Sequence, residues 1–407
     1  MRVGVLGGGL QGCCVAIVLA NRGVNVTIFD KNDALLTRAA VANEGKIHLG
    51  YMYAGDPTLS TAKTMIAGAL SFASFLERHL CRPARSFSTS VPAIYVVHRE
   101  SQHSVEEVSA YLQAVHSLIN VAAEGKNGAY FGKDLRAPLR TLSPAEKEAE
   151  FNPSAALAAV ATPEVAINPT TLAETFRKCI HEHPKIEVRC NCTVISAKKE
   201  DNSLCVVTDD PGRTSQSRFD HVVNALWDGR FALNETLGYR TNRPWLHRLK
   251  YGVSFRLPPV SRRPPPSATF VSGPFGEVVT YSDGIVYLTW YPECLQAIST
   301  DVTPPNWATY PPEPLRSRIV TGTLRALSDI VPSLSDLDAA NLPEVIVKGG
   351  AIVAWGKTDI YDPQSELHRR FEIGVTSEGC FHSVDPGKLT MAPYFAEVCA
   401  ERICPAV

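Results

Sequence analysis

Two kinds of apolar pattern alternate near the start of the chain, and together they predict an α/β unit. Residues 2–6 and 24–30 are short, apolar and rich in β-branched residues, which is typical of buried parallel strands. Residues 11–22 lie between them and are predicted to form a helix. Further helices, with apolar residues at helical spacing, are predicted to begin near residues 58 and 169.

The pattern changes after residue 236. The runs VSFRL, GEVVTYSDG and IVYLTWY are typical of antiparallel strands. The proline-rich stretches LPPVSRRPPPSA and TPPNWATYPPEP are predicted to be loops rather than peptide ligands for partner domains. At 407 residues the chain exceeds the length at which one hydrophobic core keeps growing, so we expect two domains.

A glycine-rich turn follows the first predicted strand. Gly7, Gly9 and Gly12 form G-x-G-x-x-G, in which the glycines allow a tight turn, a close approach of pyrophosphate and close helix packing. The amides at the start of the next helix would face the phosphates. Asp30 ends the second strand, where a carboxylate accepts hydrogen bonds from a ribose 2′-hydroxyl and repels a 2′-phosphate. The unit therefore predicts a dinucleotide site, disfavours NADP, and leaves NAD and FAD open.

Composition and net charge disfavour several kinds of binding partner for this chain. A formal net charge of -1 gives no broad attraction to nucleic acid or to an anionic membrane. No segment reaches membrane-spanning length, and the apolar residues 13–20 are too short and too close to the glycine turn for a targeting signal. Eleven cysteines without a repeated CxxC favour reduced thiols in the cytoplasm, and the HEH at 181–183 is expected to be solvated, so no metal site is predicted.

Three later segments favour FAD over NAD. Residues 43–80 join a polar, glycine-rich loop to a helix, residues 165–230 contain a helix, strands and the run NALWDGR, and residues 379–403 place GKLT before the last helix. With these segments the chain resembles the FAD-dependent D-amino acid oxidase superfamily, which includes glycine and sarcosine oxidases and 2-hydroxyglutarate dehydrogenase. The pattern N-x-G-x-I-H-x-G at residues 43–50 is most similar to the 2-hydroxyglutarate dehydrogenase branch.

The resemblance implies a Rossmann-type FAD-binding domain and a second, mostly antiparallel β-sheet substrate domain. The FAD-binding domain would take residues 1–85, 155–235 and 350–407, and the substrate domain residues 86–154 and 236–349. The implied function is oxidation of a C–N or C–O bond of a small polar metabolite by hydride transfer to flavin N5. Molecular oxygen or another acceptor would then reoxidise the flavin. The alternative is an FAD-binding subunit whose cofactor is structural and whose role is partner assembly.

The resemblance also implies which residues bind the cofactor. The loop 43–49 would lie beside the isoalloxazine, Val194 at the adenine, and the turn 387–390 at the pyrimidine edge. Trp227 departs from the family pattern, because it adds bulk where an Ala-Gly pair is usual. The predicted cofactor-binding residues are Gly7, Gly9, Leu10, Gln11, Gly12, Asp30, Lys31, Asn43, Glu44, Lys46, His48, Leu49, Val194, Ala225, Trp227, Gly229, Gly387, Lys388, Leu389 and Thr390.

Two residues are predicted to be catalytic. His48 could act as general base, orient the substrate, carry the flavin covalently, or be structural. Lys388 would stabilise the negative charge of a reduced flavin, with Thr390 as a plausible N-cap of the last helix. Lys46 would pair with a flavin phosphate or a substrate carboxylate, or be solvated. The predicted substrate residues are Tyr51, Tyr53, Arg256, Tyr287 and Trp290, the arginine because its guanidinium suits a carboxylate.

Overall fold

A six-stranded, mostly parallel sheet organises the nucleotide-binding half of the molecule. The computed structural model describes residues 1–125, 130–259 and 263–405. The strand order is β17-β18-β10-β1-β2-β6, and only the edge pair β17/β18 is antiparallel. Its strands are β1 (Arg2–Leu6), β2 (Asn25–Phe29), β6 (Ile186–Arg189), β10 (His221–Asn224), β17 (Gly374–Glu378) and β18 (Phe381–Asp385). The parallel strands and crossover helices predicted from the apolar pattern are confirmed.

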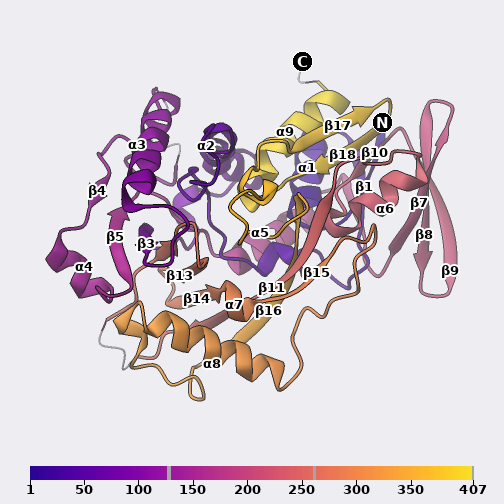
Figure 1. Cartoon of the computed structure of the whole chain (residues 1–407). Helices are drawn as coiled ribbons and strands as arrows, with labels where there is room; N and C mark the ends of the chain where they lie inside the picture. The colour runs from indigo at the N-terminus through magenta and orange to yellow at the C-terminus, as the bar shows by residue number, and fades with distance from the viewer. Residues whose placement is uncertain (126–129, 260–262, 406–407) are drawn as a thin grey trace.

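Four of the five helices of this half pack together beside the sheet, and the fifth, α6, packs on β7 (Thr193–Glu200) and β10. They are α1 (Leu10–Asn21), α2 (Ser60–Leu80), α5 (Pro169–Glu182), α6 (Arg230–Thr236) and α9 (Ala392–Ile403), with short 3-10 turns η1 (Ala39–Val41), η3 (Trp227–Gly229), η5 (Glu366–His368) and η6 (Leu389–Met391). Helix α1 packs against α9, α5 and α2, and its apolar residues are buried almost all round. Figure 1 shows α9, from the end of the chain, directly beside α1 from its start.

The second half is built on a nine-stranded, mostly antiparallel sheet. Its path is β15-β11-β14-β13-β12-β3-β5-β4, β16 pairs along the long strand β11, and β12/β3 is its one parallel pair. The strands are β3 (Ile94–His98), β4 (Arg140–Thr141), β5 (Ala156–Ala161), β11 (Trp245–Arg256), β12 (Ala268–Phe270), β13 (Gly276–Thr280), β14 (Ile285–Trp290), β15 (Leu295–Ser299) and β16 (Ile346–Trp355). The predicted α/β fold with a second antiparallel sheet is confirmed.

Further elements flank these two sheets. Helix α8 packs on β14 and β11, α3 packs on α2, and the antiparallel meander β7-β8-β9 projects at one side in Figure 1. The bounds are α3 (Val105–Ala122), α4 (Pro144–Glu150), α7 (Tyr291–Cys294), α8 (Leu315–Ser328), β7 (Thr193–Glu200), β8 (Ser203–Asp210), β9 (Arg213–Phe219), η2 (Ala84–Ser86) and η4 (Pro332–Leu334). Across the described ranges, no helix is long and apolar enough to cross a membrane.

Two strands bear on where one domain would end and the other begin. Strand β5 falls inside the predicted segment 155–235, yet it pairs with β3 of the nine-stranded sheet. Strand β16 crosses residue 350, where the third FAD segment was predicted to begin, and pairs with β11. The division into two domains stays a prediction, and boundaries after residues 161 and 355 would keep both sheets whole.

Candidate active site

A cavity of about 910 Å³ lies between the two sheets. One wall comes from the segments that follow β1, β2 and β10, at the carboxyl ends of these parallel strands. The opposite wall comes from β11, β12 and β16 of the nine-stranded sheet. Ligands of open α/β sheets bind at the carboxyl ends of the strands, so both the position and the volume suit an organic ligand.

The glycine-rich turn leaves the start of α1 open toward the cavity. Gly7 has a φ of +103°, and a Cβ on Gly12 would lie 1.9 Å from the Gly7 carbonyl oxygen, so both positions require glycine. A Cβ on Gly9 would meet no atom within 4 Å, because Gly9 faces the cavity. No side chain caps α1 and no acidic residue lies in its first turn. Its amides and positive dipole end are therefore available to an anion.

Asp30 braces this turn from β2. Its Oδ2 accepts a 2.8 Å hydrogen bond from the Gly8 amide, and its Oδ1 accepts from the backbone and side-chain nitrogens of Asn32. Asp30 also lines the cavity. A carboxylate has about four acceptor positions. The predicted contact with a ribose hydroxyl is therefore compatible with the bracing role that the structure adds.

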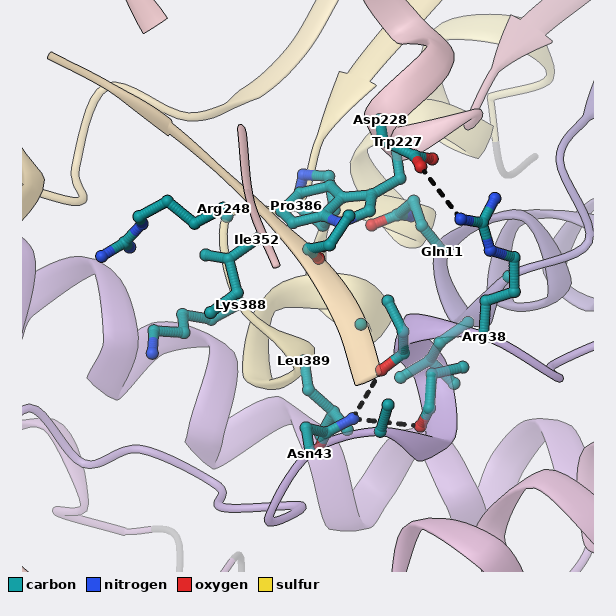
Figure 2. Close-up of a pocket in the computed structure, with 18 of the residues that line it drawn as sticks. Gln11, Arg38, Asn43, Trp227, Asp228, Arg248, Ile352, Pro386, Lys388 and Leu389 are labelled. Atoms are coloured by element: carbon teal, nitrogen blue, oxygen red, sulfur yellow. Dashed lines mark hydrogen bonds and ion pairs between the residues drawn. The ribbon is translucent and has the colours of Figure 1, made fainter. Parts of the chain in front are cut away.

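Trp227, which departs from the family pattern, has a structural role in linking two parts of the cavity wall. Trp227 has a φ of +57°, a left-handed conformation that is unusual for a bulky residue. Its indole Nε1 donates a 2.7 Å hydrogen bond to the carbonyl of Ala351 on β16, which ties the β10 turn to the second sheet. Next to it, Asp228 forms a 3.5 Å ion pair with Arg38 across the cavity (Figure 2).

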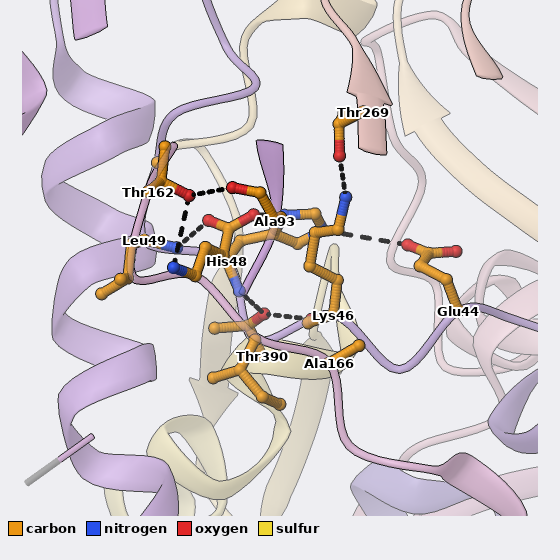
Figure 3. A network of polar contacts seen from close by, with 12 residues as sticks. Glu44, Lys46, His48, Leu49, Ala93, Thr162, Ala166, Thr269 and Thr390 are labelled. Atoms are coloured by element: carbon orange, nitrogen blue, oxygen red, sulfur yellow. Dashed lines mark hydrogen bonds and ion pairs between the residues drawn. The ribbon is translucent and has the colours of Figure 1, made fainter. Parts of the chain in front are cut away.

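The C-terminal turn and the loop 43–49 are joined by Thr390. Its Oγ1 accepts a hydrogen bond from the His48 amide at 2.9 Å and donates to the Lys46 carbonyl at 3.1 Å (Figure 3). Thr390 is fully buried, and the residue at the N-cap of α9 is Met391. The predicted capping role of Thr390 is thus wrong, because its hydroxyl is committed to the loop.

His48 is buried between two carboxylates. Its Nδ1 lies 3.8 Å from Oε1 of Glu164 and its Nε2 lies 3.9 Å from Oε1 of Glu44. Its ring meets that of Tyr53 edge-on at 5.9 Å. Burial lowers the pKa of His48, although Glu164 opposes the shift, so the imidazole is neutral near pH 7. A neutral imidazole in a cavity wall is competent to accept a proton.

Lysines from three segments converge near His48. Lys46 Nζ forms a 2.8 Å ion pair with Glu277 of β13, and Lys250 of β11 lies 3.9 Å from Glu44. Burial lowers the pKa of Lys388 to about 8, although Glu44 opposes the shift. Burial disfavours the charged form of Glu44, but Lys250 and Lys388 outweigh it and lower its pKa to about 2.

Two buried arginines also line the cavity. Arg248 of β11 is 1% exposed and its Nη1 lies 3.1 Å from Asp359. Arg370 donates to the carbonyls of Leu367 and Val353 and forms no ion pair with any carboxylate of the described chain. Burial, and then the neighbouring Arg248, lower the pKa of Arg370 to about 10. In Figure 2 the side chains of Arg248 and Lys388 extend away from Arg38 and Asp228.

Comparisons with known proteins agree with this geometry. A family model described as FAD dependent oxidoreductase matches residues 2–402. The chain belongs to the FAD-dependent oxidoreductase family. FAD is accordingly its cofactor, and the chain is an oxidoreductase.

Solved structures of the same fold are similar over nearly the whole chain. Glycine oxidase from Geobacillus kaustophilus is 15% identical with a TM-score of 0.69, and the match covers 98% of this chain and 94% of that one. L-proline dehydrogenase from P. horikoshii is 16% identical, with a TM-score of 0.65 and coverage of 99% and 93%. L-alpha-glycerophosphate oxidase from Mycoplasma pneumoniae with FAD bound is 18% identical, with a TM-score of 0.66 and coverage of 98% and 94%.

The residues of this FAD-dependent oxidoreductase fit the cofactor. The open side of Gly9 and the uncapped start of α1 would hold the pyrophosphate. Gln11 lines the cavity, and its Oε1 is buried without a partner among the described residues, so an acceptor is free for the cofactor. Lys388 and the turn that carries it line the same cavity, where they would hold positive charge at the flavin.

Most predicted cofactor residues lie on the cavity wall. Those on the wall are Gly7, Gly9, Leu10, Gln11, Asp30, Lys31, Asn43, Glu44, Lys46, His48, Val194, Ala225, Trp227, Gly229, Gly387, Lys388 and Leu389. Gly12, Leu49 and Thr390 are not on the wall and instead support the segments that are. Their roles toward FAD remain predictions.

Of the five predicted substrate residues, the structure places only Tyr53 on the wall. Arg256 is exposed at the end of β11 and pairs with Glu344, because the strand has left the cavity at that point. Tyr51 is buried against His116, which shares a hydrogen bond with its hydroxyl. Tyr287 packs on Gly252, and Trp290 packs on Gly276. We therefore do not assign these four residues to substrate contact.

Two basic residues of β11, Arg248 and Lys250, were not predicted from the sequence as site residues. Arg248 and Lys250 line the cavity, whereas Leu249 and Tyr251 enter the apolar core on the other face of the strand. This alternation was a usable signal, since residues two apart on a strand share a face. Arg370 had no such signal, because it follows η5 in a stretch without regular strand or helix.

Proposed function

We propose that this enzyme oxidises a C–N or C–O bond of a small metabolite that carries an acidic group. The observation that supports this best is the pair Arg248 and Arg370, two buried guanidiniums on one wall of the FAD cavity. Nε of Arg248 is buried and has no hydrogen-bond partner among the described residues. Arg248 is already paired with Asp359, but Arg370 has no carboxylate partner among the described residues, so an anion beside Arg370 would be stabilised.

His48 would take the substrate proton in this proposal. FAD, when bound, supplies a hydride acceptor at N5. A hydroxyl group must lose a proton as the hydride leaves, and an ammonium group must lose one beforehand; a neutral imidazole is suited to accept either proton. Lys388 would hold positive charge in place where the flavin gains negative charge, which lowers the barrier without rearrangement of solvent. Covalent attachment of FAD to His48 stays open, and a yellow acid precipitate would reveal it.

The test is anaerobic bleaching of the flavin with matched substrate pairs. Each amino acid or hydroxy acid is compared with the amine or alcohol that lacks its carboxylate, and N-methyl amines are included. We expect bleaching only by acids, and Arg370→Gln to raise the substrate Kd by about 10–100-fold, as for loss of a charge-assisted contact. A yellow protein that no member of the panel bleaches would instead favour a structural cofactor.

The acceptor that reoxidises the flavin is tested in the same cuvette. Air is admitted to the bleached protein, and the return of yellow colour is timed. Rapid return supports molecular oxygen, whereas return only with an added quinone or dye supports another acceptor. Both outcomes are compatible with the oxidation step proposed above.

A further inference from the structure

Glu164 is a buried carboxylate that the proposed reaction does not yet use. It lies between β5 and α5, is 0% exposed, and does not line the cavity. Its oxygens are held separately: Oε2 accepts the Leu49 amide at 2.6 Å, and Oε1 accepts the Tyr95 hydroxyl. A carboxylate buried at this depth needs compensation from hydrogen bonds and charges of its neighbours.

The backbone around Glu164 is also fixed. Its carbonyl accepts the Ala93 amide at 2.8 Å, and its amide donates to Thr162 Oγ1 at 3.3 Å. Together with the bonds from Leu49 and Tyr95, these contacts hold the carboxylate beside the loop 43–49, with Oε1 3.8 Å from Nδ1 of His48. That nitrogen is buried and has no hydrogen-bond partner among the described residues. Glu44, at the opposite nitrogen, does line the cavity.

We propose that Glu164 is a positioning residue that holds His48 as the Nδ1–H tautomer and leaves Nε2 to take the substrate proton. The inference rests on the proposed role of His48 as base. A carboxylate beside the remote nitrogen selects the tautomer and stabilises the imidazolium once the proton has arrived. The 3.8 Å separation is longer than a hydrogen bond, and such contacts tighten when the catalytic complex forms.

Burial lowers the pKa of His48, and the charges around the ring act on top of that shift in both directions. Glu164 and Glu44 favour the imidazolium, whereas Lys46 and Lys388 disfavour it. Tyr53 contributes a neutral ring. Burial raises the cost of ionising Glu164, but His48, Lys46 and Tyr95 outweigh it and lower the pKa of this carboxyl. Glu164 is thus an anion at neutral pH, and its removal leaves His48 with a lower pKa.

The test compares Glu164→Gln with the unaltered holoenzyme in stopped-flow flavin reduction across pH. We expect reduction to slow by about 10–100-fold, within the usual contribution of acid–base catalysis, while the Kd of the substrate stays nearly constant. The acidic limb of the pH profile should move down by about one pH unit, since an opposite charge is removed. An unchanged rate and an unmoved limb would overturn the proposal.

Two further measurements separate charge from packing. Tyr95→Phe removes a hydrogen bond to the same carboxylate but keeps the charge, so its acidic limb should stay in place. In ¹⁵N-histidine-labelled wild-type protein, the His48 signal, assigned by its loss in His48→Gln, should show a protonated Nδ1. A protonated Nε2 in the neutral ring would overturn the proposal even if Glu164→Gln fails to fold.

The failure of this inference is distinguishable from failure of the base assignment. If His48→Gln reduces its flavin at the wild-type rate, His48 is not the base and both statements fall. If His48→Gln is slow while Glu164→Gln matches the wild type in rate and pH profile, only the role of Glu164 falls.

Discussion

At the scale of single residues, the site works through charges placed where water is excluded. Lys388 is half-buried on the cavity wall, so its charge acts through a medium of lower dielectric constant than bulk water. Arg370 is buried without a carboxylate partner in the described chain, and its charge is left for a ligand. Each of these side chains has an effect that a substitution can measure.

Lys388→Met should slow flavin reduction by ~10²–10³ while changing the substrate Kd little, because the charge that Lys388 stabilises develops only as the flavin is reduced. Its pKa of about 8 adds a second expectation. The lysine is charged below that pH, so the wild-type rate should fall as pH rises through 8, and the variant should lack this limb. Single-turnover reduction measures both, with the exposed Lys63→Met as the matched control. A wild-type rate in Lys388→Met would contradict the assignment.

Asp30→Ala should weaken FAD binding by about 1–3 kcal/mol, the usual cost of losing hydrogen bonds to a charged group. The substitution removes an acceptor from the cavity wall and also the brace on the Gly8 amide. Titration of the apoprotein with FAD, followed by quenching of flavin fluorescence, gives the Kd. Asp33→Ala, at an exposed position three residues on, is the control. Equal affinities of the two variants would exclude Asp30 from the site.

At the scale of elements, the sequence predicted more of the fold than of the site. The β1–α1–β2 unit, its glycines and Asp30 were predictable because apolar runs and a local turn determine them. Arg256 shows where that reasoning fails: it shares a strand and a face with Arg248 and Lys250, but it lies eight residues beyond Arg248, roughly 26 Å at strand spacing. The alternation of polar and apolar residues predicts which side chains share a face of the strand. How the other sheet packs against the strand decides which part of that face lines the cavity.

Thr390→Val should lower the free energy of unfolding by about 1–3 kcal/mol, because the His48 amide and the Lys46 carbonyl lose a buried partner. The change is isosteric, so packing is kept. Urea unfolding of the apoprotein measures the loss without a contribution from FAD. Thr214→Val, on the exposed face of β9, should change stability by less than about 0.5 kcal/mol. A similarly small effect at Thr390 would mean that the hydrogen bonds of its hydroxyl do not contribute to the free energy of unfolding.

At the scale of the whole molecule, a histidine pair in the six-stranded sheet, with His382 buried and His221 half-buried, makes stability depend on pH. His221 and His382 stack at 5.3 Å and share a 3.1 Å hydrogen bond between β10 and β18. Burial, and then the neighbouring His221, lower the pKa of His382 from 6.5 to about 4. The folded state therefore resists a proton that the unfolded chain accepts readily.

The contribution of neutral His382 to the free energy of unfolding should accordingly be fully present above pH 6.5. It should be lost as the pH drops toward 4, which lowers the free energy of unfolding by up to about 3 kcal/mol. Urea midpoints measured between pH 7 and pH 4 test this. His382→Gln should flatten the slope, whereas His181→Gln, at an exposed helix end, should leave it intact. Parallel slopes for wild type and His382→Gln would show that other groups cause the acid sensitivity.

The link through Thr390 also has a consequence for the order of events during synthesis. Lys46 and His48 leave the ribosome early, but their hydroxyl partner lies 342 residues after His48. Strand β18 and helix α9, which flank that partner, come from the same late segment and complete the sheet beside β10 and the packing of α1. A nascent chain that has exposed only its glycine-rich turn thus lacks the part of the site that the C-terminal segment supplies. We expect stalled, ribosome-bound chains to capture FAD only when an added C-terminal linker lets residue 403 clear the exit tunnel.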